Sequence, residues 1–278
     1  MAPVALQAHR STMPLPSAPS LLPTSLSASG YNMLVACPYQ FFASRMLRLG
    51  SAEELTDLPE KRDYGNWVHS ILLQYHETVS QQSTHADQRL ALLERLSTEV
   101  FDQVLLHEPA ALPYVVRWRK QIPGYIAWAN AHEEAGWTFA FGEYQSERVL
   151  SWDGGGIRLK GRLDRVDQHA EGHWMVLDYK TTDKGRLKRK LVEREDHQLS
   201  FYGLLLEQTV MSAAYVAIDA DKPDAIPAEP YEIWRDALEV RLKKDLKNIA
   251  DGSSLPASGV ASTCDWCDVR GLCRKGNW

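Results

Sequence analysis

The sequence is poor in cysteine, has no excess of positive charge and lacks a long apolar run. Four cysteines in 278 residues, in a chain that we expect to be cytoplasmic, predict no disulfides. The 31 Lys and Arg are outnumbered by 36 Asp and Glu, for a net charge of −5, so any contact with a polyanion must come from a local cluster of basic residues. The most apolar stretch, 203–218, is interrupted by Glu207 and Gln208, which excludes a transmembrane helix there.

Two further absences narrow the function. The N-terminus has no compact apolar segment of the kind that a secretion signal requires, so we expect a cytoplasmic protein with no membrane contact. The chain also has no Gly-x-x-x-x-Gly-Lys-[Ser/Thr] loop for nucleotide phosphates. Any nucleotide-driven motor that works with this chain must therefore lie on another polypeptide or on sequence beyond this one.

Proline and serine are concentrated in residues 1–26. This composition is typical of a disordered arm or an interdomain linker. We expect order to begin at Ser27, whose side chain can cap a helix. The remaining residues, 27–278, predict one folded domain, because 44% hydrophobic residues are ample for a core.

The hydrophobic period changes twice along this domain. Apolar residues recur at helical spacing before residue 136, alternate from Thr138 on, and return to helical spacing near residue 195. We therefore predict helices near 64–79, 86–106, 115–135, 195–209 and 232–250, and strands near 138–151, 156–168, 173–181 and 212–219. This order predicts an α/β fold in which helices flank a mixed central sheet and further helical segments precede it.

Acidic residues and a lysine lie close together on two of the predicted strands. Asp178 and Lys180 are two places apart in an extended strand, so their side chains point to one face, about 7 Å apart. Asp164, at the end of a neighbouring strand, can bring a second carboxylate to that face. Two carboxylates beside a lysine suit metal-dependent hydrolysis of phosphodiesters. Surface ion pairs, including those within Asp164-Arg165-Val166-Asp167, are the ordinary alternative.

Three other polar residues could belong to the same site. His69 lies on the helix near 64–79, and imidazole can bind Mn²⁺, although most single helical histidines are core or surface residues. Gln198 and Tyr202 are four places apart and so share one face of a helix. They could orient Lys180 or contact a phosphate, or they could be no more than polar positions on that helix.

Taken together, these motifs resemble the RecB/AddB branch of the PD-(D/E)xK nuclease superfamily. The resemblance runs from Ser27 to Cys273, and its strength lies in the number and order of the motifs. It implies a restriction-endonuclease-like core and a metal-dependent DNA nuclease, an exonuclease of repair or recombination that works with a helicase partner or a fused helicase. The motifs are Ser27-x-Ser29-x-Tyr31, Cys37-Pro38-Tyr39-Gln40-Phe41-Phe42, Gly65-x-x-x-His69, Gly161-Arg162-Leu163-Asp164-Arg165-Val166-Asp167, Asp178-Tyr179-Lys180-Thr181 and Gln198-x-x-x-Tyr202.

The resemblance also assigns roles to individual residues. It implies that His69, Asp164, Asp178 and the Tyr179 carbonyl hold Mg²⁺ or Mn²⁺. Lys180 would orient or help deprotonate the attacking water and stabilise the charge that develops on the phosphorane. The remaining members would be Gln198 and Tyr202, which support that lysine and the nucleic-acid strand, and Glu147 as an additional site residue, for which Glu143 competes.

The cysteines form a separate pattern. Cys264-x-x-Cys267 followed by Cys273 provides three ligands for zinc or for an iron–sulfur cluster. Cys37 can be the fourth, or His173 or His197 could complete a Cys₃His zinc site. The resemblance favours the first arrangement, because relatives with an iron–sulfur cluster carry one cysteine before the nuclease core and three after it. It implies a structural [4Fe–4S] cluster held by Cys37, Cys264, Cys267 and Cys273, with residues 264–273 as its tail.

A basic segment directly follows the strand that carries Lys180. Its position favours contact with DNA phosphates, single-stranded or at a duplex end, although a solvated helix face or loop is the ordinary explanation. Trp118 could stack on a base, but core packing is the stronger interpretation. No base-reading motif is present, so we expect little sequence specificity. The basic residues are Lys184, Arg186, Lys188, Arg189, Lys190 and Arg194.

Three alternatives remain open from the sequence. The chain could be a non-catalytic module that only binds DNA for a helicase–nuclease complex. It could be a zinc-stabilised regulatory protein. Its substrate could also be RNA.

Overall fold

The computed structural model describes residues 12–50, 58–193, 196–220 and 222–278. The chain forms two compact units, each assembled from segments that lie far apart in the sequence. Within the described residues, the first unit contains 12–50, 149–158 and 240–278, and the second contains 58–148 and 159–239. The extent predicted for the nuclease domain, 27–278, stays a prediction.

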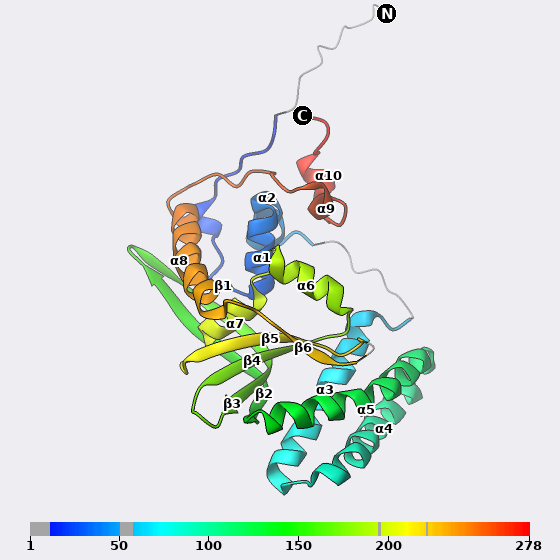
Figure 1. Cartoon of the computed structure of the whole chain (residues 1–278). Coiled ribbons are helices and arrows are strands. Elements are labelled where there is room, and N and C mark those ends of the chain that lie inside the picture. The colour runs from blue at the N-terminus through cyan, green and yellow to red at the C-terminus, as the bar shows by residue number, and fades with distance from the viewer. Residues whose placement is uncertain (1–11, 51–57, 194–195, 221) are drawn as a thin grey trace, which may run out of the picture. The chain divides into compact units, whose positions relative to one another are not determined.

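The second unit is built around a mixed β-sheet (Figure 1). β3 pairs with β4 in the antiparallel sense, β4 pairs with β5 in the parallel sense, and β5 pairs with β6 in the antiparallel sense. β2 pairs with β3. The predicted α/β fold with a mixed sheet is confirmed. The strands are β2 (Trp137–Trp152), β3 (Gly155–His169), β4 (Trp174–Lys180), β5 (Val210–Ala217) and β6 (Asp224–Pro227).

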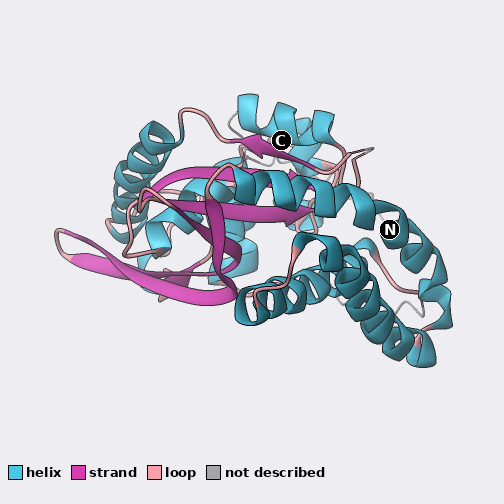
Figure 2. Ribbon diagram, turned by 60° about the horizontal axis from the view of Figure 1, so that its bottom comes forward, coloured by secondary structure: helices cyan, strands magenta, loops and turns pink. Residues whose placement is uncertain are grey.

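Helices cover both faces of this sheet (Figures 1 and 2). α3 (Lys61–Gln82), α4 (Arg89–His107) and α5 (Leu112–Glu134) bury their apolar residues against Leu177 and Tyr179 of β4. α6 (Lys184–Val192) and α7 (Gln198–Leu205) lie on the opposite face. Because side chains alternate along a strand, Asp178 and Lys180 point away from α3–α5 and toward α7. Short 3₁₀ helices, η3 (Ala86–Gln88) and η4 (Pro109–Ala111), precede α4 and α5.

Local sequence explains where these helices begin. α3 starts three residues before its predicted start, because Glu60 and Asp63 form a capping box in which the Asp63 carboxylate accepts the Glu60 N–H at 2.8 Å.

Trp118 is fully buried, and its indole N–H donates to the Ser97 hydroxyl at 2.8 Å. Core packing of this tryptophan is therefore confirmed. Among the helices that the structure describes, none is long and apolar enough to cross a membrane.

The first unit is mainly helical. Ser27 caps α1 by accepting the Gly30 N–H, as predicted, and the Tyr31 hydroxyl donates to Asp245 at 3.0 Å. Cys37 is extended between α1 and α2 and ends the first helix before Pro38 begins the next. The elements are η1 (Pro19–Leu21), β1 (Ser25–Leu26), α1 (Ala28–Ala36), α2 (Pro38–Phe41), η2 (Phe42–Met46), most of α8 (Tyr231–Ala250), α9 (Ala261–Cys264) and α10 (Arg270–Cys273).

The predicted start of order at Ser27 is too late. Residues 1–11 of the predicted arm lie outside the described residues, but 12–26 contain η1 and β1. The Pro16 carbonyl accepts the Leu255 N–H at 2.7 Å, and the Ser17 hydroxyl donates to the Gly252 carbonyl at 2.7 Å. The proline-rich segment therefore docks through the carbonyl of Pro16, which proline retains, and through the Ser17 hydroxyl.

Candidate active site

Asp178 and Lys180 meet on the face of β4 that α7 covers. The Lys180 Nζ lies 2.5 Å from Asp178 Oδ2, and the Asp178 side chain is only 1% exposed. Asp164 reaches the same region from β3, where its Oδ2 accepts the Tyr179 backbone N–H at 2.9 Å. The two carboxylates and the lysine expected from the sequence therefore lie together, and each is held by a partner.

His69 brings α3 to this group. Its Nδ1 lies 3.2 Å from Glu143 Oε1 and 3.6 Å from Asp164 Oδ1. The donor atoms of His69, Glu143 and Asp164 all lie within 4.8 Å of one another. One imidazole and two carboxylates at this spacing can hold a single Mg²⁺ or Mn²⁺.

Glu143 occupies the position that the sequence assigned first to Glu147. Its φ of +45° is unusual for a residue with a side chain. Beside it, a Cβ on Gly142 would lie 2.9 Å from the Asp164 carbonyl oxygen, so glycine is needed for this close approach of β2 to β3. Arg162 holds the other carboxylate oxygen of Glu143 at 2.8 Å. Glu147, the first choice, is exposed, and it is Glu143 that the structure places beside His69 and Asp164.

Gln198 connects the lysine, a carboxylate and Tyr202. Its Oε1 accepts from Lys180 Nζ at 3.1 Å, while its Nε2 donates to Asp178 Oδ1 and to the Tyr202 hydroxyl, both at 2.8 Å. A Cβ on Gly161 would lie 3.0 Å from the Tyr202 ring, so this glycine makes room for the tyrosine. Because Gln198 and Tyr202 share one face of α7, they contact each other, and Gln198 also contacts Lys180 and Asp178.

The charges of this group are strongly coupled. Burial and the neighbouring Asp178 raise the pKa of Asp164 to about 7. Burial opposes the charge of His69, but the hydrogen bond that its ring donates to Glu143 and the charge of Asp164 raise its pKa above the ordinary value. Burial also opposes the charge of Lys180, yet Asp178 raises the pKa of this lysine well above its usual range. The site thus concentrates carboxylates whose repulsion a divalent cation would relieve.

Tyr179 turns its side chain to the other face of the sheet. Its hydroxyl lies 2.9 Å from the Tyr125 hydroxyl of α5, and its ring packs edge-on against the His69 ring, with centroids 5.7 Å apart. The Tyr179 side chain thus contacts His69 but points away from Asp178 and Lys180, and its backbone carbonyl remains compatible with the ligand role implied by the resemblance.

The four cysteines gather in the first unit. A Cβ on Gly259 would lie 3.4 Å from both the Cys37 and the Cys264 sulfur atoms. Burial raises the pKa of the Cys267 thiol, and the neighbouring Cys37, Cys273 and Cys264 add to the rise. His173 and His197, the alternative zinc ligands, both belong to the second unit.

The predicted basic segment is a helix, α6. Leu187 and Leu191 are buried, whereas Arg186, Lys188 and Arg189 are exposed. Lys184 pairs with Asp224 at 2.7 Å, and Lys190 with Asp196 at 3.4 Å. Arg194 lies outside the described residues. The helix therefore presents a basic, solvent-exposed face.

Known proteins share parts of this chain. An uncharacterized protein of Rickettsia bellii is 25% identical over 162 residues, which cover 58% of this chain and 19% of that protein. A second relative, one of the subunits of an ATP-dependent helicase/deoxyribonuclease of Streptococcus equi subsp. zooepidemicus, is 28% identical over 171 residues, covering 59% of this chain and 15% of that relative. This chain thus spans less than a fifth of the length of either relative.

The solved structure of SSO0001 aligns over 90% of this chain and 85% of its own, with 16% identity and a TM-score of 0.39. A separate match, to a protein family, extends over more of the chain than the matches to the two relatives do. The sequence model of the PD-(D/E)XK nuclease superfamily matches residues 25–274. A mixed sheet with helices on both faces agrees with the restriction-endonuclease-like fold of these nucleases. The chain therefore belongs to the PD-(D/E)XK nuclease superfamily.

Proposed function

We propose that this protein is a metal-dependent deoxyribonuclease of DNA repair or recombination, acting as an exonuclease. The observation that carries the proposal is the group of buried Asp178 with half-buried Asp164 and Lys180, joined by His69 and completed by Gln198. A binding module would have no need for carboxylates that repel one another next to a half-buried lysine, because taking them out of water is costly. An enzyme that recruits a divalent cation would use them.

The metal would be Mg²⁺ or Mn²⁺, held by His69, Asp164, Asp178 and the Tyr179 carbonyl. Glu143 joins this set through its contact with His69. When bound, the ion would supply Lewis acidity to the scissile phosphate and favour ionisation of the attacking water. Oxygen ligands with one imidazole suit these two ions better than softer metals.

Lys180 would act as a fixed cation. Its raised pKa keeps the ammonium group charged at neutral pH, so it can orient water and stabilise the developing phosphorane charge but is a poor proton acceptor. Gln198 accepts from the ammonium and donates to Asp178, so it would hold both side chains in register. Tyr202 would support Gln198 through the contact at 2.8 Å.

The exposed cations of α6 would receive the DNA backbone. Lys184 and Lys190 already pair with carboxylates, so Arg186, Lys188 and Arg189 would provide most of the phosphate contacts. We also propose a helicase partner or a fused helicase. This part of the proposal is supported by the similarity to part of a helicase/deoxyribonuclease.

The cysteines would hold a structural [4Fe–4S] cluster. A tetrahedral zinc ion with Zn–S bonds of about 2.3 Å brings its sulfurs to roughly 3.8 Å from one another. A [4Fe–4S] cluster spaces its four thiolates more widely than this. The neighbouring positions of Cys37, Cys264, Cys267 and Cys273 support Cys37 as the fourth ligand.

The test is cleavage of end-labelled single- and double-stranded DNA by anaerobically purified protein, with Mg²⁺, with Mn²⁺ or with EDTA. We expect cutting that requires the metal and a product ladder that begins at an end. Lys180→Ala should reduce the rate at least about a hundredfold, because the variant loses the charge that stabilises the transition state.

A matched variant controls for the loss of a lysine. Lys247→Ala removes an ammonium that also pairs with a carboxylate, Asp251 at 2.7 Å, but lies on α8 in the first unit. It should cut at the wild-type rate. Metal-independent cutting, or equal loss in both variants, would contradict the proposal, and preferred cutting of a labelled RNA would move the substrate from DNA to RNA.

A further inference from the structure

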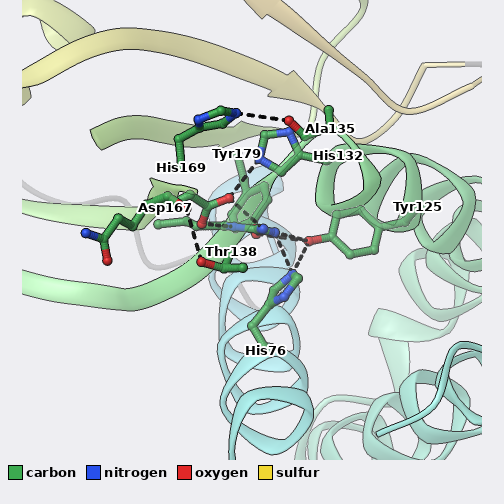
Figure 3. Close-up of polar contacts among 10 residues, drawn as sticks. His76, Tyr125, His132, Ala135, Thr138, Asp167, His169 and Tyr179 are labelled. Atoms are coloured by element: carbon green, nitrogen blue, oxygen red, sulfur yellow. Dashed lines mark hydrogen bonds and ion pairs between the residues drawn. The ribbon is translucent and has the colours of Figure 1, made fainter. Parts of the chain in front are cut away.

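A hydrogen-bonded network of polar side chains lies on the face of the sheet opposite to Asp178 and Lys180. It joins His76 of α3 and Tyr125 and His132 of α5 to Arg165 and Asp167 of β3 and to Tyr179 of β4. Figure 3 shows the side chains of His76, Tyr125 and Tyr179 turned toward one another. Every member belongs to the second unit.

The centre of the network is a buried ion pair. Arg165 donates to both carboxylate oxygens of Asp167, at 2.7 and 2.8 Å, and the two side chains are 1% and 0% exposed. His132 lies 2.8 Å from the same carboxylate. Burial opposes the charge of Asp167, but Arg165 holds the pKa of this carboxyl below its usual range. A charged pair this deep is costly to bury, so a contribution to stability is a poor explanation for its presence.

The remaining hydrogen bonds of Arg165 lead to Tyr179. Its Nη1 lies 2.8 Å from His76 Nε2 and 3.4 Å from the hydroxyls of both Tyr125 and Tyr179. Because a guanidinium can only donate, His76 Nε2 must be the acceptor and carries no proton. The Tyr179 hydroxyl is thus fixed by two neighbours, Arg165 and Tyr125.

Tyr179 touches the acidic group in two ways. Its backbone N–H donates to Asp164 Oδ2 at 2.9 Å, and its ring packs edge-on against His69. It also stands between Asp178 and Lys180 in the strand. The position of one hydroxyl on the far face therefore affects the setting of three proposed metal ligands and of the lysine.

We propose that this network positions the metal site through Tyr179. Three elements that supply a proposed ligand also supply a network member: α3 carries His69 and His76, β3 carries Asp164 and Arg165, and β4 carries Asp178 and Tyr179. The network fixes the three elements relative to one another at a point directly behind the ligands. Tyr179, Tyr125 and Arg165 are positioning residues in this account. The inference rests on the proposed metal site.

The experiment compares Tyr179→Phe with a matched hydroxyl deletion elsewhere in the same unit. Tyr179→Phe keeps the ring, the backbone N–H and the carbonyl and removes only the far-side hydroxyl. Tyr64→Phe removes a hydroxyl that is also buried and also lies on a core tyrosine, where it donates to Asp219 at 3.1 Å. Mn²⁺ affinity is measured by electron paramagnetic resonance, beside the melting temperature and the Mn²⁺ dependence of DNA cleavage.

We expect Tyr179→Phe to weaken Mn²⁺ binding about tenfold, as loss of a partner that orients a ligand does, and high Mn²⁺ to restore much of its cleavage rate. Tyr64→Phe should keep the wild-type affinity even if it melts earlier. Tyr125→Phe, which leaves Arg165 as the partner of the Tyr179 hydroxyl, should show a smaller shift and serves if Tyr179→Phe does not fold.

Each other outcome has a definite meaning. Wild-type Mn²⁺ affinity in both Tyr179→Phe and Tyr125→Phe would overturn the proposal, since a network that serves stability alone would change only the melting temperature. If the expected shift occurs in a protein that cuts no nucleic acid, the positioning role stands and the nuclease proposal fails. A wild-type protein that binds no Mn²⁺ would overturn both.

Discussion

At the scale of single residues, the site is dominated by the cost of placing carboxylates close together. Asp164 is the clearest case, because burial and then Asp178 raise its pKa to about 7. An ordinary aspartate has lost its proton well below that pH. The proton and a divalent cation therefore compete for the Asp164 carboxylate, and the proton must leave before the metal can bind.

This competition predicts a pH dependence for metal binding. Below pH 7 the metal must displace the proton of Asp164, so on this account alone the affinity for Mn²⁺ should fall about fivefold between pH 7 and 6 and level off above about pH 8. His69, whose pKa is also raised, adds to the slope. Calorimetric titration with Mn²⁺ at pH 6, 7 and 8 checks this.

The same pKa has a consequence for stability without metal. A carboxyl whose folded-state pKa is raised from 3.8 to about 7 keeps a proton that the unfolded chain has lost. Its contribution to the free energy of unfolding is then present below about pH 4 and is lost as the pH rises to 7. Asp164→Asn should reduce the pH slope of both the Mn²⁺ affinity and the free energy of unfolding, and in the wild-type protein an affinity for Mn²⁺ that is equal at pH 6 and 8 would contradict the account.

Residue spacing predicts most of the site but not all of it. Alternation along β4 is sufficient to place Asp178 and Lys180 together. It cannot separate Glu143 from Glu147, because the two lie an even number of places apart on one strand, and the contact of Glu143 with His69 distinguishes them. The ion pair of Arg165 with Asp167 is buried rather than at the surface, and alternation alone does not predict this, since their burial depends on packing against α3 and α5.

At the scale of elements, the proposed role of α6 is to contact DNA phosphates through the cations on its exposed side. Its two buried leucines fix one side of the helix and leave the cations on the other. Because phosphate contacts release counterions, they can be counted from the salt dependence of binding.

A triple variant tests this face. Replacing Arg186, Lys188 and Arg189 by alanine should weaken binding to single-stranded DNA and lower the slope of log K against log salt by about 2, or roughly 0.7 for each lost contact. Lys243→Ala, Lys244→Ala and Lys247→Ala on α8 remove the same charge and are the control. Equal effects of the two triples would mean that α6 has no special role.

Long elements follow from the hydrophobic period, and short ones do not. The helices α3, α4, α5 and α8 and the strands β2 to β5 lie near their predicted ranges, whereas α7 (Gln198–Leu205) covers about half of the predicted 195–209. β6 (Asp224–Pro227) has four residues, one of them a proline, and β1 (Ser25–Leu26) has two. Segments this short contain at most two periods of alternation, so only their pairing with a neighbouring strand identifies them.

At the scale of the whole molecule, the cysteines join the two ends of the chain. Cys37 precedes the nuclease motifs and the other three cysteines follow them. Because loop-closure entropy grows only slowly with loop length, metal–thiolate bonds would contribute most of the stabilisation. The first unit would therefore depend on the cluster.

Removing one thiol should show this dependence. We expect Cys273→Ser to lose a broad absorbance in the near-ultraviolet and visible and to melt several degrees lower, at roughly 2–4 °C for each kcal/mol lost in a chain of this size. Lys180→Ala should keep the absorbance. A colourless wild-type protein with one equivalent of zinc would rule out the cluster.

The most direct test of the central claim concerns Asp178, which contacts both Lys180 and Gln198. Asp178→Asn keeps the size of the side chain but removes the charge needed by the metal and the lysine. Cleavage of end-labelled single-stranded DNA is measured for both proteins across a range of Mg²⁺, together with DNA binding. The account predicts a rate at least about a hundredfold lower at every Mg²⁺ concentration, with binding retained. An Asp178→Asn variant that cuts as fast as wild type would contradict it.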